Sequence, residues 1–477
     1  MDRRAPSWAA VVGALVVALG FLRGLDRLHD NSFLTHLATG RLIQVDCIPR
    51  VDPYSFTAEG EPWVVQSWLV SWFFALVEDL VGLGGIRVVV GLLSAAIVAM
   101  LWTSTAAARS IVLRLGVVAL ALAALLPNIA ERPLLVGLVG VGLCVLAIDG
   151  RVDPRWLLPM GWVWVSSHGS FPLGLAIVGV AWVGVRLDRG DDRVELQRLV
   201  WMVLGLLLGA VDPLGPRLLW FPVELLGRTD LLREHVLEWR AFGLDAPGAY
   251  GALAMLLLAA WALVRRWSWR DAGLVLVFAV AALTSRRNIP AAVLVMAPVI
   301  ARSLPDVGAI RGDRPLGVGR AALVAVAGAC LVVAVASLRQ PALALDAYPV
   351  AFVERLEDAD AMGRDAEVRV ATEDFVGNYL TFLYGPDAGV FVDDRFDMYP
   401  LEILEDYLTL ATAEADSGEQ EAVLDRYGFD VVLWRQDRPM EEWIESADGW
   451  VRGPTDDRYW IACRADSDAA ATICGAG

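Results

Sequence analysis

The chain has 477 residues, 57% of them hydrophobic, and a mean hydropathy of +0.53. These values lie outside the range of soluble globular proteins and within that of membrane proteins with several spans. The net charge of −16 is uneven, because residues 341–477 hold 31 acidic side chains against 10 arginines and residues 1–340 therefore carry +5. Such an acidic part argues against a nucleic-acid-binding protein, since carboxylates repel phosphates.

Apolar stretches recur along the first 340 residues, and a membrane span needs about 20 apolar residues, or somewhat fewer in a tightly packed bundle. The first follows Arg3 and Arg4 and resembles a signal peptide without a convincing cleavage site, so we interpret it as a retained signal anchor. We predict eleven spans, of which the fifth is short, near residues 6–22, 85–103, 110–127, 133–149, 156–167, 171–186, 199–212, 249–264, 271–285, 289–303 and 320–338.

Arginine marks alternate gaps between these stretches, and the chain has no lysine. The arginines are Arg3, Arg4, Arg109, Arg114, Arg151, Arg155, Arg186, Arg189, Arg193, Arg198, Arg265, Arg266, Arg270, Arg302, Arg311 and Arg314. Basic residues near span ends collect on the cytoplasmic side of a membrane. The alternation therefore predicts a protein of the cytoplasmic membrane with a cytoplasmic amino terminus and an external acidic tail.

The stretch Val64–Leu80 is apolar enough to be mistaken for a further span. Counting it as one would move every later arginine cluster to the outside, so we interpret it as a helix in the outer interface. Trp63, Trp68 and Trp72 are then expected at headgroup level. The segment Asn31–Gln44 also looks amphipathic, and the first external loop, 23–84, is expected to hold two interfacial helices.

The tail changes character after Arg339, where short strand-like and helical pieces alternate. The strand-like pieces are Val368–Thr372, Val390–Val392 and Val431–Trp434, and the helical ones are Ala351–Asp358, Leu401–Ala413 and Gln420–Tyr427. We therefore predict a membrane domain at 1–339 and a small external α/β domain at 340–477, which is long enough to have its own core.

The five cysteines, Cys47, Cys144, Cys330, Cys463 and Cys474, have no metal-ligand spacing. Cys463 and Cys474 can form a disulfide if the tail is extracellular, and the alternative is two free thiols.

On this topology the external loops contain most of the unusual polar residues. They include Asp26, Asp30, His36, Asp46, Asp52, Glu131, Arg132, His168, Asp212, His235, Glu238, Arg286, Arg287 and Asn288. Ionisable groups at a membrane boundary are costly unless paired or hydrated, which makes them functional candidates. The alternative for each one is an ordinary water-facing loop residue.

Asp30 is the strongest candidate, because it comes just before an apolar helix. A carboxylate there can serve as a general base at the membrane surface or simply cap the helix. His36, six residues on, can orient a carboxylate or phosphate, or be a polar face residue. Asp52 precedes Pro53, so its first role is to form a turn.

Arg286 and Arg287 lie at an outer boundary and oppose the positive-inside trend, so they need a partner. A lipid phosphate suits them, because arginine binds phosphate oxygens in a bidentate fork. Lipid headgroups or Glu238 are the alternatives, and Arg132 is a weaker case of the same kind. His168 joins two short spans, where a structural turn is the alternative to a role in the site.

Several short motifs, taken in order, resemble bacterial GT-C-type membrane glycosyltransferase-like proteins. In the first loop they are Asp30-x-x-Phe33-x-x-His36-Leu37-Ala38-Thr39-Gly40, Ile48-Pro49-x-x-Asp52-Pro53-Tyr54-Ser55-Phe56-Thr57 and Pro62-Trp63-Val64. Further on they are Trp164-x-x-x-His168-Gly169-Ser170-Phe171, Asp212-Pro213-Leu214-Gly215, Glu238-Trp239 and Arg286-Arg287-Asn288-Ile289-Pro290. The tail adds Gly377-Asn378-Tyr379-Leu380 and Phe391-Val392-Asp393-Asp394-Arg395-Phe396-Asp397-Met398-Tyr399.

The resemblance implies a polytopic α-helical GT-C-like bundle with a small external α/β domain. It also implies transfer of a sugar, with inversion, from a polyprenyl-phosphate donor to a cell-envelope glycan or protein, among membrane lipids. Asp30 is then the base for the acceptor hydroxyl, and Arg286 or Arg287 contacts the lipid phosphate. Residues His36, Asp52, Arg132, His168, Glu238 and Asn288 are the other candidates for binding substrate.

The chain departs from this family at two places in the first loop, and it has Asp212-Pro213-Leu214-Gly215 where the family usually has Asn-Pro-Tyr-Gly. The family often reads Asp-x-Asp where this chain has Asp30-Asn31-Ser32, and Gln66-Ser67 stands where the family has His-Glu. A cofactor is not implied, and a divalent metal is only weakly supported. The alternative is a non-catalytic protein of the same fold that binds a lipid-linked glycan or scaffolds an envelope complex.

Overall fold

The structure is a computed structural model that describes residues 5–229, 233, 236–306, 312–413 and 418–475. Arg3, Arg4, Arg311 and His235 of the sequence analysis lie outside the described residues. The chain divides by its contacts into two units. The bundle unit is Met1–Leu28 with Val77–Ala342, and the tail unit is His29–Leu76 with Leu343–Gly477.

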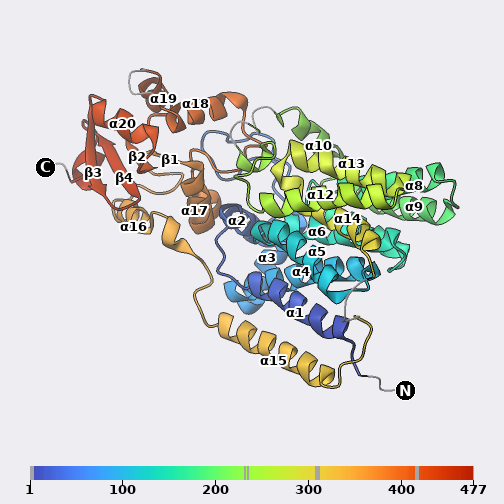
Figure 1. Cartoon of the computed structure of the whole chain (residues 1–477). Coiled ribbons are helices and arrows are strands. Elements are labelled where there is room, and N and C mark those ends of the chain that lie inside the picture. The colour runs from blue at the N-terminus through green and yellow to red at the C-terminus, as the bar shows by residue number, and fades with distance from the viewer. Residues whose placement is uncertain (1–4, 230–232, 234–235, 307–311, 414–417, 476–477) are drawn as a thin grey trace. The chain divides into compact units, whose positions relative to one another are not determined.

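The bundle unit is helical (Figure 1). Its helices are α1 (Trp8–Arg23), α4 (Leu83–Ser104), α5 (Ile111–Leu125), α6 (Leu134–Ile148), α7 (Leu157–Val165), α8 (Pro172–Leu187), α9 (Arg193–Leu207), α10 (Arg217–Leu226), α12 (Ala249–Arg265), α13 (Trp269–Thr284), α14 (Ile289–Ser303) and α15 (Gly319–Ser337). Short 3-10 turns connect them, namely η1 (Thr105–Ala107), η2 (Leu126–Asn128), η3 (Pro154–Trp156), η4 (Leu208–Val211), η5 (Leu237–Trp239) and η6 (Arg286–Asn288). Each predicted span overlaps one of these helices, although α9 begins six residues before the predicted span 199–212.

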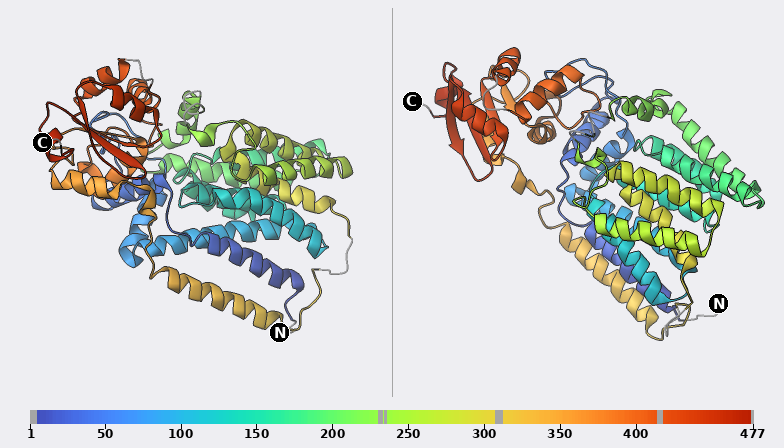
Figure 2. Two further views of the ribbon diagram at one scale, coloured as in Figure 1. Left: turned by 60° about the vertical axis from the view of Figure 1, so that its left-hand side comes forward. Right: turned by 45° about the horizontal axis from the view of Figure 1, so that its top comes forward.

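Helix α14 forms the core of the bundle, because it packs on α5, α6, α12 and α13. Its side chains are buried from Ile289 to Ala301, as expected of a helix that is apolar on every face. Helix α15 lies at the edge of the bundle and packs mainly on α1, which leaves most of its apolar surface exposed (Figure 2).

Four helices among the described residues are long and apolar enough to cross a membrane. They are Leu83–Ala107, Ile111–Asn128, Arg193–Val211 and Gly319–Ser337, and four shorter apolar helices accompany them. The chain is therefore a membrane protein. The number of eleven spans stays a prediction, because α7 has nine residues and reaches only about 14 Å at 1.5 Å per residue.

Ion pairs fix which helix ends of the bundle lie together. Asp149, just after α6, accepts from Arg270 at 2.8 Å and from Arg302 at 3.0 Å. Arg302 also pairs with Asp271 at 2.8 Å. The end of α6, the start of α13 and the end of α14 therefore meet, and the opposite ends of these helices adjoin Arg132 and η6. The arginines predicted to be cytoplasmic are thus about 20 Å from Arg286–Asn288 along these helices.

The tail unit contains helices and one sheet (Figure 1). Its elements are α2 (Asn31–Val45), the first part of α3 (Trp68–Val81), η7 (Leu345–Ala347), α16 (Val350–Asp358), β1 (Val370–Thr372), α17 (Asp374–Tyr384), η8 (Gly385–Asp387), α18 (Leu401–Ala411), α19 (Glu419–Tyr427), β2 (Val431–Arg435), α20 (Pro439–Ser446), β3 (Trp450–Thr455), β4 (Tyr459–Arg464) and α21 (Ala469–Thr472).

The sheet has the order β1-β2-β4-β3, with β1 parallel to β2 and the other neighbours antiparallel. Strand β2 is central, and its residues Val431–Trp434 are buried, which agrees with the continuous apolar run in the sequence. The β3–β4 hairpin was not predicted from the sequence. The predicted strand Val390–Val392 is instead an isolated bridge from Val390 to Ser55, because the first loop, not the sheet, lies beside it.

Cys463 of β4 and Cys474 form a disulfide in the structure, which decides between the two alternatives left open by the sequence. The cystine is buried, and Gly453 of β3 lies against Cys474, where an added Cβ would come within 2.9 Å of the sulfur. The bond therefore ties the end of the chain to the sheet.

The segment 29–76 groups with the tail unit, whereas the predicted membrane domain, 1–339, includes it. Three hydrogen bonds show why: Thr35 to Asn378 at 2.9 Å, Tyr348 to Asn31 at 2.9 Å and Arg41 to the carbonyl of Phe382 at 3.0 Å. Helix α2 packs on α17, so its apolar face is covered by protein.

The ring of Trp63 in the first loop is buried inside the tail unit. Trp63 was expected at headgroup level, but its ring is buried, 7% exposed, against the guanidinium of Arg395 at 4.5 Å. The indole gains a cation–π contact inside the tail unit that the sequence pattern does not reveal.

Candidate functional site

The start of α2 is held by side chains from the tail. Asp30 is the N-cap residue and is half-buried, but its side chain makes no capping hydrogen bond to α2, which the structure describes throughout. The next two residues bind the tail instead: Asn31 accepts from Tyr348, and Ser32 Oγ donates to Asp394 Oδ2 at 2.5 Å. The neighbours of Asp30 thus hold the start of α2, and helix capping, the alternative role for the Asp30 side chain, is not observed.

Asn378 of α17 connects α2 to the segment around Asp394. Its Oδ1 accepts from the backbone N–H of Asp394 at 3.1 Å and from Thr35 Oγ1 at 2.9 Å. Gly377 allows this approach, because an added Cβ would lie 1.9 Å from the carbonyl oxygen of Val392. The two tail motifs noted in the sequence therefore meet each other and the first loop.

Asp394 is an unusual carboxyl group. Burial raises its pKa to about 7, and the neighbouring carboxylates of Asp393 and Asp374 add to the rise, while hydrogen bonds from Ser32 and Asn378 oppose it. Burial likewise raises the pKa of Asp374, whose carboxylate accepts from Tyr407 at 2.7 Å. The first turn of α2 therefore faces a carboxyl group that changes charge near neutral pH.

This shift predicts how stability depends on pH. The folded pKa of Asp394 lies above its ordinary value of 3.8, so between about pH 4 and pH 7 the folded state binds more protons than the unfolded state. Stability should therefore fall as the pH rises through this window. Asp394→Asn should remove that loss and raise stability at pH 8 by roughly 2–4 kcal/mol relative to wild type, since one pKa unit is about 1.4 kcal/mol.

Thermal unfolding of the purified protein in detergent at pH 5 and pH 8 measures the effect. Asp387→Asn is the control, because Asp387 is an exposed carboxyl group of the same unit. If the stability of Asp394→Asn depends on pH in the same way as that of wild type, the raised pKa does not belong to Asp394.

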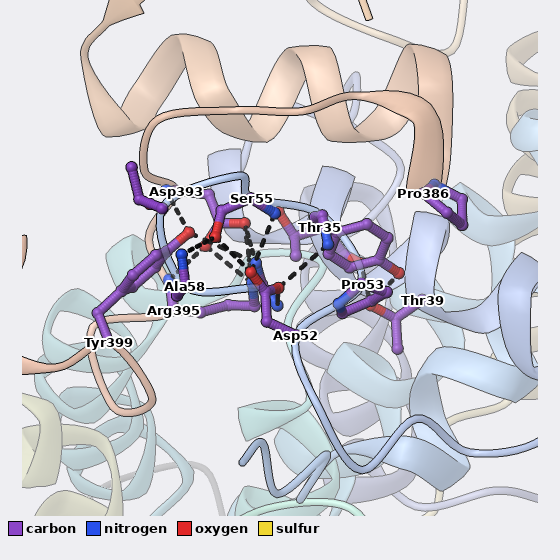
Figure 3. A network of polar contacts seen from close by, with 12 residues as sticks. Thr35, Thr39, Asp52, Pro53, Ser55, Ala58, Pro386, Asp393, Arg395 and Tyr399 are labelled. Carbon is purple, nitrogen blue, oxygen red and sulfur yellow. Dashed lines mark hydrogen bonds and ion pairs between the residues drawn. The ribbon is translucent and has the colours of Figure 1, made fainter. Parts of the chain in front are cut away.

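Asp52 lies in a buried network that links the first loop to residues 393–399 (Figure 3). Its carboxylate pairs with Arg395 at 2.7 Å and accepts from the backbone N–H groups of Tyr54 and Ser55 and from Ser55 Oγ. Arg395 also pairs with Asp393 at 2.7 Å. The Asp52 side chain is fully buried and saturated, which favours the turn-forming alternative over contact with substrate.

Aromatic rings surround the Arg395 guanidinium. Tyr54, Trp63 and Tyr399 lie with ring centres 4.8, 4.5 and 5.8 Å from it. Burial raises the pKa of Tyr54 to about 12, so its hydroxyl stays protonated and donates to Thr39 Oγ1 at 3.0 Å. The network is a buried structural contact within the tail unit, between the first loop and residues 393–399.

His36 lies between α2 and α3. Its Nδ1 is 3.3 Å from Ser71 Oγ, and the ring is half-buried. Close packing of the two helices brings these groups together, because an added Cβ on Gly40 would lie 1.9 Å from the carbonyl oxygen of Ser71. The geometry gives His36 a polar contact across the helix pair.

A second group of predicted site residues meets in the bundle unit, where η5 packs on η6. Arg132 forms an ion pair with Glu238, and the guanidinium of Arg287 stacks over the ring of Trp239 at 4.6 Å. Ser285 Oγ donates to the carbonyl oxygen of Glu238 at 3.2 Å and helps hold η5 in place. Residues separated by more than 150 positions thus form one cluster, which we call the guanidinium cluster (Arg132, Glu238, Trp239 and Arg287).

The two adjacent arginines have different surroundings. Arg286 pairs with Asp245 at 2.9 Å and donates to the carbonyl of Ala241 at 3.0 Å. Asn288 donates to the carbonyl of Ala281 at 3.1 Å and so closes the end of α13. Arg286 and Asn288 therefore hold the loop, and Arg287 is the member of the motif that belongs to the guanidinium cluster.

His168 binds its own turn. Its Nδ1 lies 2.8 Å from Ser170 Oγ and 3.1 Å from the backbone nitrogen of Ser170, and Trp164 Nε1 donates to the same hydroxyl at 3.0 Å. This favours the structural alternative for His168. Among the residues that the structure describes, no group of three or more His, Cys, Asp or Glu is arranged to hold a metal ion.

The bundle and the small mixed sheet together have a GT-C-like fold. The first similar structure is the oligosaccharyltransferase AglB of Archaeoglobus fulgidus in complex with an inhibitory peptide and a dolichol-phosphate, with a TM-score of 0.53, 11% identity, and coverage of 89% of this chain and 69% of that chain. Another is the Archaeoglobus fulgidus oligosaccharyltransferase tethered to an acceptor peptide containing the NVT sequon, with a TM-score of 0.54, 12% identity, and coverage of 98% and 77%. No family model and no curated protein matches the sequence.

Proposed function

We propose that this protein is a membrane glycosyltransferase that moves a sugar from a polyprenyl-phosphate donor to a cell-envelope acceptor, outside the cytoplasmic membrane and with inversion. The guanidinium cluster is the observation that carries the proposal. Its cationic side chains lie at the end of the bundle opposite the Asp149 ion pairs. Such an end of a membrane-spanning bundle suits a lipid phosphate headgroup, and this supports the proposal.

The proposed reaction balances with the groups available. The acceptor oxygen bonds to the anomeric carbon from the face opposite the phosphate, and its proton passes to the Asp30 carboxylate. The bond between the anomeric carbon and the phosphate oxygen breaks, and polyprenyl phosphate leaves with the negative charge. Arg287, and Arg132 beside Glu238, stabilise that charge.

The similar structures support the class of donor. AglB of Archaeoglobus fulgidus was obtained with a dolichol-phosphate and an inhibitory peptide, and the related structure with an acceptor peptide. A lipid phosphate and an acceptor glycan or protein are therefore the ligands that we infer for this chain.

The transfer assay tests the proposal. Membranes containing the protein are given a labelled sugar on polyprenyl phosphate together with an envelope extract, and label that enters the extract is counted against membranes without the protein. Transfer that depends on the protein is expected. If no donor in a panel of hexosyl and pentosyl polyprenyl phosphates gives transfer that depends on the protein, the proposal that it is an enzyme is wrong.

Sidedness is part of the proposal, and the Cys463–Cys474 disulfide supports it, because such bonds persist in oxidising compartments. An alkaline phosphatase reporter fused after Gly477 should be active, since it needs the same compartment to fold. A reporter fused within Arg189–Arg193 should be silent. The opposite pair of signals would contradict the orientation.

The second candidate is a non-catalytic protein that binds a lipid-linked glycan or scaffolds an envelope complex. Ser32, Gln66 and Ser67 favour it, because they stand where the resembled family has titratable side chains. This candidate predicts that the purified protein binds the donor but that no labelled sugar enters the envelope extract in the transfer assay.

A further inference from the structure

Glu238 lies among cations that the proposed function assigns to the donor. Its carboxylate pairs with Arg132, and the side chains of the pair are 47% and 30% exposed, so a ligand can reach them. Within the described part of the chain, Glu238 and Arg132 are the charged groups that act on the Arg287 guanidinium. The cluster is therefore a cationic site with one anion built into it.

The charge of the cluster follows from its members. Two guanidiniums and one carboxylate sum to a single positive charge. Arg286 adds nothing to this sum, because Asp245 neutralises it at 2.9 Å. The ring of Trp239 stacks on the Arg287 guanidinium, with its centre 4.6 Å away, and so adds a cation–π contact to the cluster.

A single net positive charge discriminates between two classes of lipid donor. A sugar linked through one phosphate is a phosphodiester with one negative charge, which the cluster balances. A diphosphate carries at least one further negative charge, and Glu238 repels it at short range. Repulsion of this kind produces specificity by disfavouring the wrong ligand.

We propose that Glu238 is the residue that selects a lipid phosphodiester donor against a lipid diphosphate. The inference rests on the proposed function and adds to it the residue that discriminates between donor classes. Glu238 acts by cancelling one of the two guanidinium charges, so the site keeps enough attraction for one phosphate and too little for two.

Two short-chain probes measure this selectivity on the purified full-length protein in detergent: farnesyl methyl phosphate, a diester, and farnesyl diphosphate. Wild type should bind the diester more tightly. Glu238→Gln keeps the side-chain shape and removes its charge, so it should shift the ratio of the two dissociation constants at least tenfold towards the diphosphate.

Matched variants separate the charge effect from a change in folding. Glu238→Asp keeps the charge and should keep the wild-type ratio. Asp191→Asn removes an exposed carboxylate in the loop before α9, with a side chain that is 76% exposed, and its ratio should change less than threefold. Arg287→Gln should weaken binding of both probes.

The outcomes distinguish this inference from the proposed function. If both probes bind and Glu238→Gln leaves their ratio unchanged, the role of Glu238 is overturned while the lipid-phosphate site stands. If wild type prefers the diphosphate, the role is also overturned. If wild type binds neither probe, both proposals fail.

Discussion

Replacing Asp30 with asparagine should lower sugar transfer by about 10²–10⁴-fold, the usual contribution of a general base. Asparagine has nearly the same shape as aspartate but cannot accept the proton of the acceptor hydroxyl. The start of α2 should stay in place, because Asn31 and Ser32 bind Tyr348 and Asp394 independently of residue 30. The transfer assay described above, with membranes matched for protein content, provides the measurement.

Asp46→Asn is the matched control, because Asp46 is an exposed carboxylate at the other end of the same helix. It should keep wild-type transfer. Binding of farnesyl methyl phosphate to the Asp30→Asn protein should also be unchanged, since the base acts on the acceptor and not on the phosphate. Full turnover by Asp30→Asn would remove Asp30 from the mechanism, and loss of both turnover and probe binding would indicate a structural defect instead.

The helices of the bundle could be predicted because their signal is local. A long apolar stretch between polar gaps identifies a helix in a membrane protein, and α4, α5 and α15 lie within a few residues of the predicted bounds. Helix α17 was missed, because Gly377 and Asn378 interrupt its apolar run and are poor helix formers. Both residues are there for contacts with α2 and residues 392–394, which no local pattern contains.

The candidate site was predicted in part. The sequence identified Arg287 and Glu238 and offered Glu238 as one partner of the outer arginines. The structure brings them into one cluster, but Arg132 is the residue paired with Glu238, and Asp245 is the residue paired with Arg286. These pairs join loops that are 106 and 41 residues apart, so only the fold determines them.

Asp394 could not have been found from its motif alone. Its raised pKa arises mainly from burial, with smaller contributions from the carboxylates of Asp393 and of Asp374, twenty positions earlier in the chain. A run of Asp393-Asp394-Arg395 otherwise reads as a solvated turn. The order of the motifs gave the only signal, because Asn378 and Asp394 belong to the two tail segments that resemble the GT-C-type proteins.

Arg395 should be the most sensitive position in the tail unit. Arg395→Met keeps much of the side-chain volume but removes the positive charge. The carboxylates of Asp52 and Asp393, whose side chains are fully buried, are then left without a counter-charge. Removing one partner of a buried ion pair costs about 3–5 kcal/mol, and the contacts with Tyr54 and Trp63 are lost as well. Thermal and denaturant unfolding in detergent, followed by limited proteolysis, should show a tail unit that opens at a much lower temperature.

Arg364→Gln is the control for this change, since Arg364 also joins the tail to the first loop, by donating to the carbonyl of Pro53 at 2.9 Å. Arg364 is half-buried, and its ion-pair partner Glu59 is 74% exposed. Arg364→Gln should therefore lower the free energy of unfolding by only about 1 kcal/mol. The triple variant Asp52→Asn, Asp393→Asn, Arg395→Met removes all three charges and should recover part of the stability, because the largest cost is a carboxylate left buried alone. A free energy of unfolding for Arg395→Met within about 0.5 kcal/mol of the wild-type value would contradict this prediction. It would mean that the carboxylates of Asp52 and Asp393 reach water and that the contact between the first loop and residues 393–399 is not buried as the structure indicates.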